Sequence, residues 1–71
     1  MLVKFKMIDG RDVAINPENV TECFGGNSTT RICFTAGDYT DVDSSFEETV
    51  KKLNEASMSS GISALLDAMN Q

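Results

Sequence analysis

Residues 3–15 read VKFKMIDGRDVAI, and this stretch decides the fold that the chain is expected to adopt. On both sides of its central Asp-Gly pair, apolar side chains alternate with polar or charged ones. Successive side chains of a β-strand point to opposite faces, so each flank is expected to form a strand with one apolar face. The Asp-Gly pair is typical of a tight turn. The stretch therefore predicts an antiparallel hairpin.

Burial of the apolar face selects the length of the hairpin loop. A two-residue turn at the Asp-Gly pair would set Lys6 opposite Val13 and send the apolar side chains of the two strands to different faces. A loop over residues 8–10, with Gly10 in the left-handed conformation, keeps these side chains on one face. This register pairs Phe5 with Val13, Val3 with Ile15 and Lys6 with Asp12. A loop over residues 9–11 has the same parity, so both odd loops remain possible.

Three further runs of β-forming residues follow, each bounded by turn residues. They are residues 20–24, 31–35 and 39–42. The Asn-Pro pair at residues 16–17 ends the second strand, because it begins a type I turn and Pro cannot join a central ladder. The chain therefore predicts a small, curled antiparallel sheet of about five strands.

After Ser44, the spacing of the apolar residues changes from two to about 3.6, the period of an amphipathic helix. Phe46, Val50 and Leu53 fall on one stripe, which is expected to cover the sheet. Two overlapping capping boxes fit the start of this helix, Ser44 with Glu47 and Ser45 with Glu48. A sheet followed by a helix that packs on it belongs to the α+β class.

Residues 57–61, SMSSG, interrupt the helical pattern with poor helix formers. The pattern then resumes in a second apolar stripe, called here the C-terminal stripe, which consists of Ile62, Leu65, Leu66 and Met69. We therefore expect a short second helix. The chain is divided accordingly into a domain of sheet plus helix, residues 1–57, and a C-terminal helical extension, residues 58–71.

The C-terminal stripe is the candidate protein-interaction site. An isolated helix of about ten residues is marginal in water, so its apolar side must be buried against something. Either the short helix folds back on the sheet beside the first helix, or it packs on another copy of the chain or on a partner protein. The sequence leaves both arrangements open.

Composition and charge exclude several classes of function. The 71 residues include 6 Lys and Arg against 11 Asp and Glu, a net charge of −5 and the wrong sign for holding phosphate backbones. The chain has no His, so imidazole catalysis and His-containing zinc sites are excluded. We expect no nucleic-acid binding, no cofactor and no enzyme activity.

Two groups of residues invite a chemical role and are better explained without one. The aspartates at positions 38, 41 and 43 lack the spacing of a calcium loop and are interpreted as solvated charges that discourage edge pairing. Cys23 and Cys33 would lie opposite each other if their hairpin is centred on Ser28, and a small shift of the centre would separate them. Two reduced, half-buried thiols are the expected state.

The first residues of the chain contain no long apolar stretch of the signal-peptide type, and no apolar run is long enough to span a membrane. Two cysteines are also too few for a scaffold held by disulfides. These observations predict a protein of the reducing cytoplasm.

The chain resembles the FlbD family of small bacterial flagellar and swarming-motility proteins over residues 2–54. The resemblance is carried by residues 9–11, Ile15-Asn16-Pro17, Val20, residues 32–37, Val42 and residues 45–48. It implies strands joined by Gly turns, then a helix with an acidic start, and a role in motility-associated regulation. It implies no catalytic residues. Short acidic chains are also common among phage and prophage proteins, so a phage accessory factor is the competing interpretation.

Taken with the exclusions above, the sequence predicts a non-catalytic protein-binding or accessory protein of bacterial or phage origin. One alternative is a structural subunit that forms homo-oligomers through the C-terminal stripe. Another is an acidic phage-encoded inhibitor that mimics nucleic acid.

Overall fold

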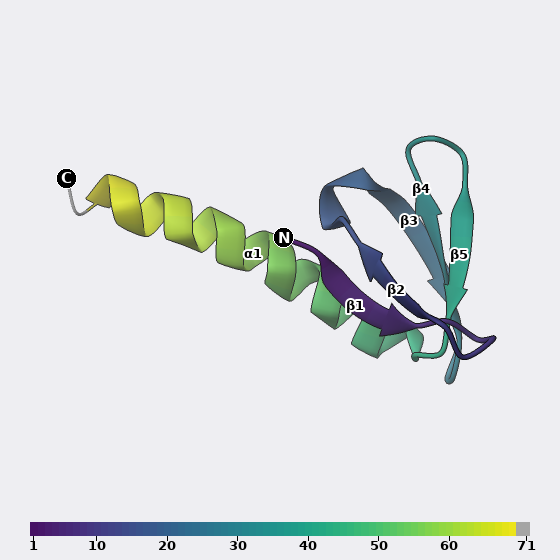
Figure 1. Ribbon diagram of the computed structural model, residues 1–71. Coiled ribbons are helices and arrows are strands. Elements are labelled where there is room, and N and C mark those ends of the chain that lie inside the picture. Colours follow the sequence, from purple (N-terminus) through teal and green to yellow (C-terminus); the bar gives the residue numbers. More distant parts are fainter. Residues whose placement is uncertain (70–71) are drawn as a thin grey trace.

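The computed structural model describes the backbone of residues 1–69 and the side chains of residues 1–57 (Figure 1). The strands and one long helix occupy separate parts of the chain, as in an α+β fold. The elements are β1 (Val3–Lys6), β2 (Asp12–Ile15), a 3₁₀ turn η1 (Pro17–Asn19), β3 (Val20–Gly25), β4 (Thr30–Phe34), β5 (Tyr39–Val42) and α1 (Phe46–Met69).

The first hairpin has the register that burial parity predicts. Phe5 lies opposite Val13, and the flanking pairs are Val3 with Ile15 and Lys6 with Asp12. The loop covers residues 8–10, because the backbone N–H of Met7 donates to the carbonyl of Arg11 at 2.7 Å. Gly10 has φ of 92°, a conformation that residues with a Cβ rarely adopt. Of the two odd loops, the structure selects the first.

The five strands form two sheets, and the prediction of a single sheet of about five strands is corrected here. β1 and β2 make a two-stranded sheet, and β3, β4 and β5 make a three-stranded one. A single bridge between Met7 and Val42 joins them, supported by a hydrogen bond of 2.7 Å from the Asp43 N–H to the Lys6 carbonyl. The pairing does not extend further, because the chain leaves β1 for its loop and leaves β5 for the helix at the same point.

The core lies between the two sheets and the first half of α1. Its buried apolar members are Phe5, Ile15, Ile32, Val42 and Leu53. The helix presents Thr49, Leu53 and Ala56 to this core. Of the predicted stripe, Leu53 is buried and Val50 is half-buried, so the buried side of the helix is turned only away from Phe46. Phe46, which was expected to cover the sheet, is 39% exposed.

The start of α1 agrees with the sequence and its length does not. The Ser45 hydroxyl accepts a hydrogen bond of 3.2 Å from the Glu48 N–H, which selects the second of the two capping boxes. The helix then continues to Met69, and the predicted break at residues 57–61 is absent. The prediction of two helices was therefore wrong. Ser and Gly cost a helix only up to about 1 kcal/mol each, and the segment has no Pro to stop it.

The helix continues past the sheets instead of folding back on them (Figure 1). Its 24 residues, at about 1.5 Å per residue, give a rod about 36 Å long. The backbone of the C-terminal stripe belongs to this outer half of α1. The side chains of Ile62, Leu65, Leu66 and Met69 lie outside the described part of the chain, so their role stays a prediction.

Candidate functional site: an exposed aromatic face

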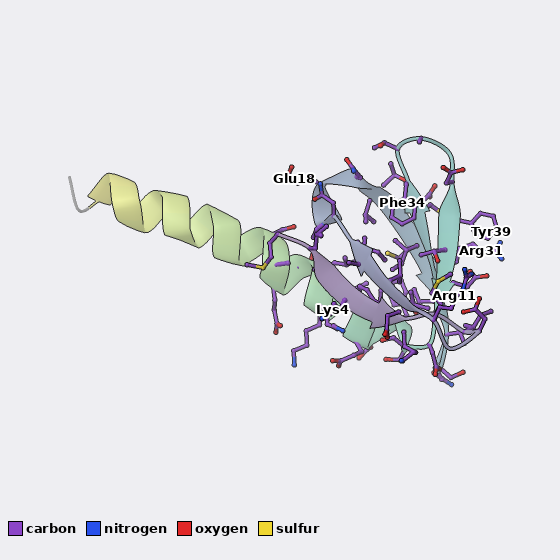
Figure 2. All side chains as sticks on the ribbon, viewed as in Figure 1. Lys4, Arg11, Glu18, Arg31, Phe34 and Tyr39 are labelled. Atoms are coloured by element: carbon purple, nitrogen blue, oxygen red, sulfur yellow. The ribbon has the colours of Figure 1, made fainter. Side chains whose placement is uncertain are left out.

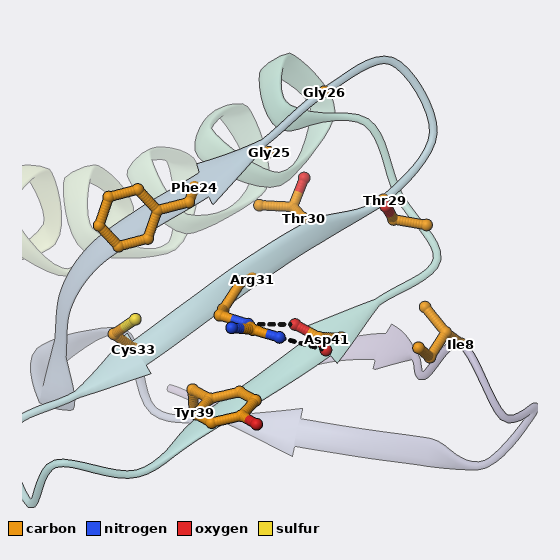
Figure 3. A pocket seen from close by; sticks show the side chains of 10 residues that line it. All are labelled: Ile8, Phe24, Gly25, Gly26, Thr29, Thr30, Arg31, Cys33, Tyr39 and Asp41. Carbon is orange, nitrogen blue, oxygen red and sulfur yellow. Dashed lines mark hydrogen bonds and ion pairs between the residues drawn. The ribbon is translucent and has the colours of Figure 1, made fainter.

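A shallow hollow of about 670 Å³ lies on the outer face of the sheet β3-β4-β5 (Figure 3). We call this surface the aromatic face. It is lined by Ile8, Phe24, Gly25, Gly26, Thr29, Thr30, Arg31, Cys33, Tyr39 and Asp41. The helix lies behind β3, on the other side of the sheet, so α1 leaves the hollow open.

The strand register brings the central side chains of this face together. Phe24 lies opposite Arg31 in β4, and Arg31 lies opposite Asp41 in β5. The neighbouring row of side chains along the strands, which contains Ile32, points to the opposite face of the sheet and into the core. Phe24, Arg31 and Asp41 therefore form one row across three strands on the solvent side.

Arg31 is held from two directions. Its guanidinium donates to both carboxylate oxygens of Asp41, at 2.8 and 3.2 Å, and lies 4.1 Å from the centre of the Tyr39 ring. The hydrogen bond from Arg31 lowers the pKa of Asp41, and the same bond raises the pKa of Arg31. Figure 2 shows Arg31 and Tyr39 on the side of the molecule that faces away from α1. The two charges cancel, so the middle of the face is polar but neutral.

Three large apolar side chains surround this ion pair. Ile8, Phe24 and Tyr39 are 59%, 56% and 58% exposed. Ile8 reaches the face from the first hairpin, because its N–H donates to the Asp41 carbonyl at 3.2 Å. Exposed apolar residues scattered singly are normal, whereas a cluster around one hollow marks a contact surface.

The two cysteines do not face each other. Cys23 lies opposite Ile32, and Cys33 lies opposite Glu22, so successive alternation sends the two thiols to different faces of the sheet. Burial raises the pKa of the Cys23 thiol, which packs against the core. The hairpin is centred half a residue before Ser28, and this small shift is enough to separate the pair.

The predicted acidic cluster has a different arrangement from that of a cation site. Asp41 binds Arg31, and Asp43 joins the two sheets through its backbone N–H. Within the part of the chain whose side chains the structure describes, no three Asp, Glu, Cys or His residues are arranged to hold a metal ion. Asp41 is thus part of the aromatic face and stabilises its Arg.

Sequence reasoning missed the aromatic face, although a signal for it was present. Phe24 is two residues from Glu22, and Tyr39 is two residues from Asp41, so each aromatic side chain points to the same side of its strand as a charged one. An aromatic residue on the polar side of a half-buried strand is expected to be exposed to solvent. Ile8 had no such signal, because its position depends on the contact between the two sheets.

No protein family, curated protein or solved structure matches this chain in a comparison. Among the described residues, no helix has both the length and the apolar character needed to cross a membrane.

Proposed function

We propose that this chain is a non-catalytic accessory protein, of bacterial or phage origin, that docks on a partner protein through the aromatic face. The observation that carries the proposal is the cluster of Ile8, Phe24 and Tyr39, each more than half exposed around one hollow. Such an arrangement is the usual anatomy of a contact surface, with apolar anchors near a polar group that fixes orientation.

The energetics favour a contact of this kind. Burying a large apolar side chain contributes roughly 1.5–3 kcal/mol, and Tyr and Arg are enriched among the residues that dominate binding energy. Arg31 is already held by Asp41 and Tyr39, so little side-chain freedom is lost when a partner covers it. The face is therefore preorganised for binding.

The test compares capture of proteins from a bacterial lysate by three forms of the chain. The double variant Phe24→Ser with Tyr39→Ser should lose the captured partner, and wild type should retain it. Leu2→Ser is the matched control, since Leu2 is 64% exposed and lies away from the hollow. Equal capture by the double variant and the control would refute docking through this face.

A second candidate function is a homo-oligomeric subunit assembled through the C-terminal stripe. The observation that favours it is the continuation of α1 beyond the sheets, where no other described element runs beside it (Figure 1). A helix end with an apolar stripe in its sequence needs a second surface to cover it.

The resemblance to a known family indicates which cellular system the partner would belong to. Similarity to the FlbD family over residues 2–54 suggests that the partner belongs to the motility apparatus. The alternative of a nucleic-acid mimic has less support, because Arg31 neutralises Asp41 at the centre of the aromatic face.

A further inference from the structure

The outer edge of β1 is already occupied by other parts of the chain. The Lys6 carbonyl accepts a hydrogen bond from the Asp43 N–H at 2.7 Å. The Lys4 carbonyl accepts one from the Lys52 ammonium, also at 2.7 Å, while that ammonium lies 4.4 Å from the centre of the Phe5 ring. The connection between β5 and α1 and a lysine of α1 therefore close this edge against pairing with another chain.

The outer edge of β3 is closed only at its end, where the Phe46 N–H of α1 donates to the Gly26 carbonyl at 2.9 Å. Among the described residues, no hydrogen bond from outside the sheet reaches Cys23 or Gly25. The Gly26 N–H donates to the Thr29 carbonyl at 3.1 Å. Because hydrogen-bonded and non-hydrogen-bonded residue pairs alternate along an antiparallel ladder, this bond shows which residues of β3 are bonded to β4. Phe24 then exchanges hydrogen bonds with Arg31, and the peptide groups of Cys23 and Gly25 point away from β4. β3 has six residues, more than any of the other four strands.

A groove runs beside this open edge, between β3 and α1. It has a volume of about 270 Å³. Its lining residues are Pro17, Val20, Thr21, Glu22, Cys23, Phe46, Val50, Leu53, Asn54 and Ser57. The helix contributes an apolar wall, and the bulge between Val20 and Glu22 limits the regular edge to the second half of β3.

We propose that the free edge of β3 pairs with an extended segment of the partner protein. The segment becomes a fourth strand of the sheet β3-β4-β5. Its side chains alternate, so one set enters the groove against Val50 and Leu53, and the other set lies on the aromatic face beside Phe24. This inference rests on the proposed function and defines how the partner is bound.

Charge complementarity identifies the chemistry of the segment. Glu22 is the one charged residue among those that line the groove, and the chain as a whole carries a net charge of −5. A segment in which Lys or Arg alternates with apolar residues therefore fits both sides of the new strand. A second copy of the chain brings the same negative charge to the edge and is disfavoured as the occupant.

The test uses amide hydrogen exchange with a blocked peptide of alternating Lys and Val. Saturating peptide should slow exchange at Cys23 and Gly25 at least about tenfold, because an edge N–H that becomes hydrogen bonded exchanges only on opening. The Phe24 amide, already bonded to β4, should change little. A peptide of alternating Glu and Val should give no protection.

Two outcomes of this measurement would overturn the inference. One is unchanged exchange at Cys23 and Gly25 with peptide at millimolar concentration. The other is protection of both amides that rises with protein concentration alone, which would make a second copy the occupant.

A pair of variants at one position isolates the edge donor. Cys23→Pro removes the N–H that points away from β4, a position where an edge strand tolerates Pro, and Cys23→Ala removes the side chain alone. Peptide affinity should fall at least about tenfold for Cys23→Pro relative to Cys23→Ala, a loss expected when an edge hydrogen bond is removed. Equal affinity of two folded variants would reject the pairing. If Cys23→Pro fails to fold, the exchange measurement on wild type decides.

The proposed function and the mode of binding can fail separately. Loss of partner capture in Phe24→Ser with Tyr39→Ser, together with unchanged capture in Cys23→Pro, would keep the aromatic face and remove strand pairing. Loss in Cys23→Pro alone would keep strand pairing and remove the aromatic face as an anchor.

Discussion

At the scale of single residues, the ion pair between Arg31 and Asp41 makes the stability of the folded chain depend on pH. The hydrogen bond from Arg31 lowers the pKa of Asp41 in the folded chain. A carboxylate with a lowered folded pKa contributes stability above its unfolded pKa and loses it as the pH falls through the folded pKa. The melting temperature of wild type should therefore exceed that of Asp41→Asn at neutral pH, and the difference should shrink under acid conditions.

Asp38→Asn is the matched control for this prediction. It removes the same charge beside the same strand, while the ion pair of Arg31 with Asp41 is retained. Thermal melts of the three proteins at a series of pH values provide the comparison. A gap between wild type and Asp41→Asn that stays constant from neutral to acid pH would show that the ion pair does not stabilise the fold.

At the scale of elements, the continuity of α1 through Gly61 can be tested directly. Gly61→Ala should strengthen the helix by up to about 1 kcal/mol, the difference between the two residues in a helix interior. Gly61→Pro should lower the helical signal, because Pro removes a backbone hydrogen bond and clashes with the preceding turn. Far-UV circular dichroism measures both effects. An unchanged signal in Gly61→Pro would restore the break that the sequence predicted.

The two ends of the chain show why elements differ in how well the sequence predicts them. The first hairpin was predicted in its register, since Phe5 and Val13 can share a buried face with an odd loop only. The helix break predicted at residues 57–61 is absent from the structure, because weak propensities are overruled once a helix is nucleated and propagates. Local rules were sufficient for the turn and insufficient for the helix end.

The aromatic face could be predicted neither from burial parity, as the hairpin was, nor from helix propensity. Phe24 and Tyr39 meet through strand pairing that the sequence describes only as a hairpin, and Ile8 joins them through the contact between the two sheets. The helix was likewise turned on its axis, with Thr49 fully buried where Phe46 was expected. Such details depend on how elements pack, which the period of apolar residues does not specify.

At the scale of the whole molecule, the outer half of α1 is the place where we expect the protein to associate with itself or with a partner. The sheets contact the first half of the helix, and a free helix of about twelve residues is marginal in water. If two copies join through the C-terminal stripe, Leu65→Glu with Leu66→Glu should convert an oligomer into a folded monomer in light-scattering measurements.

Ser60→Glu with Ala64→Glu is the matched control. It adds the same charge on the side of the helix opposite the stripe, as the helical period places these residues, and should leave the mass unchanged. A wild-type mass equal to one chain would reject self-association and leave the stripe to a partner protein, and an equal loss of mass in both double variants would trace the effect to charge.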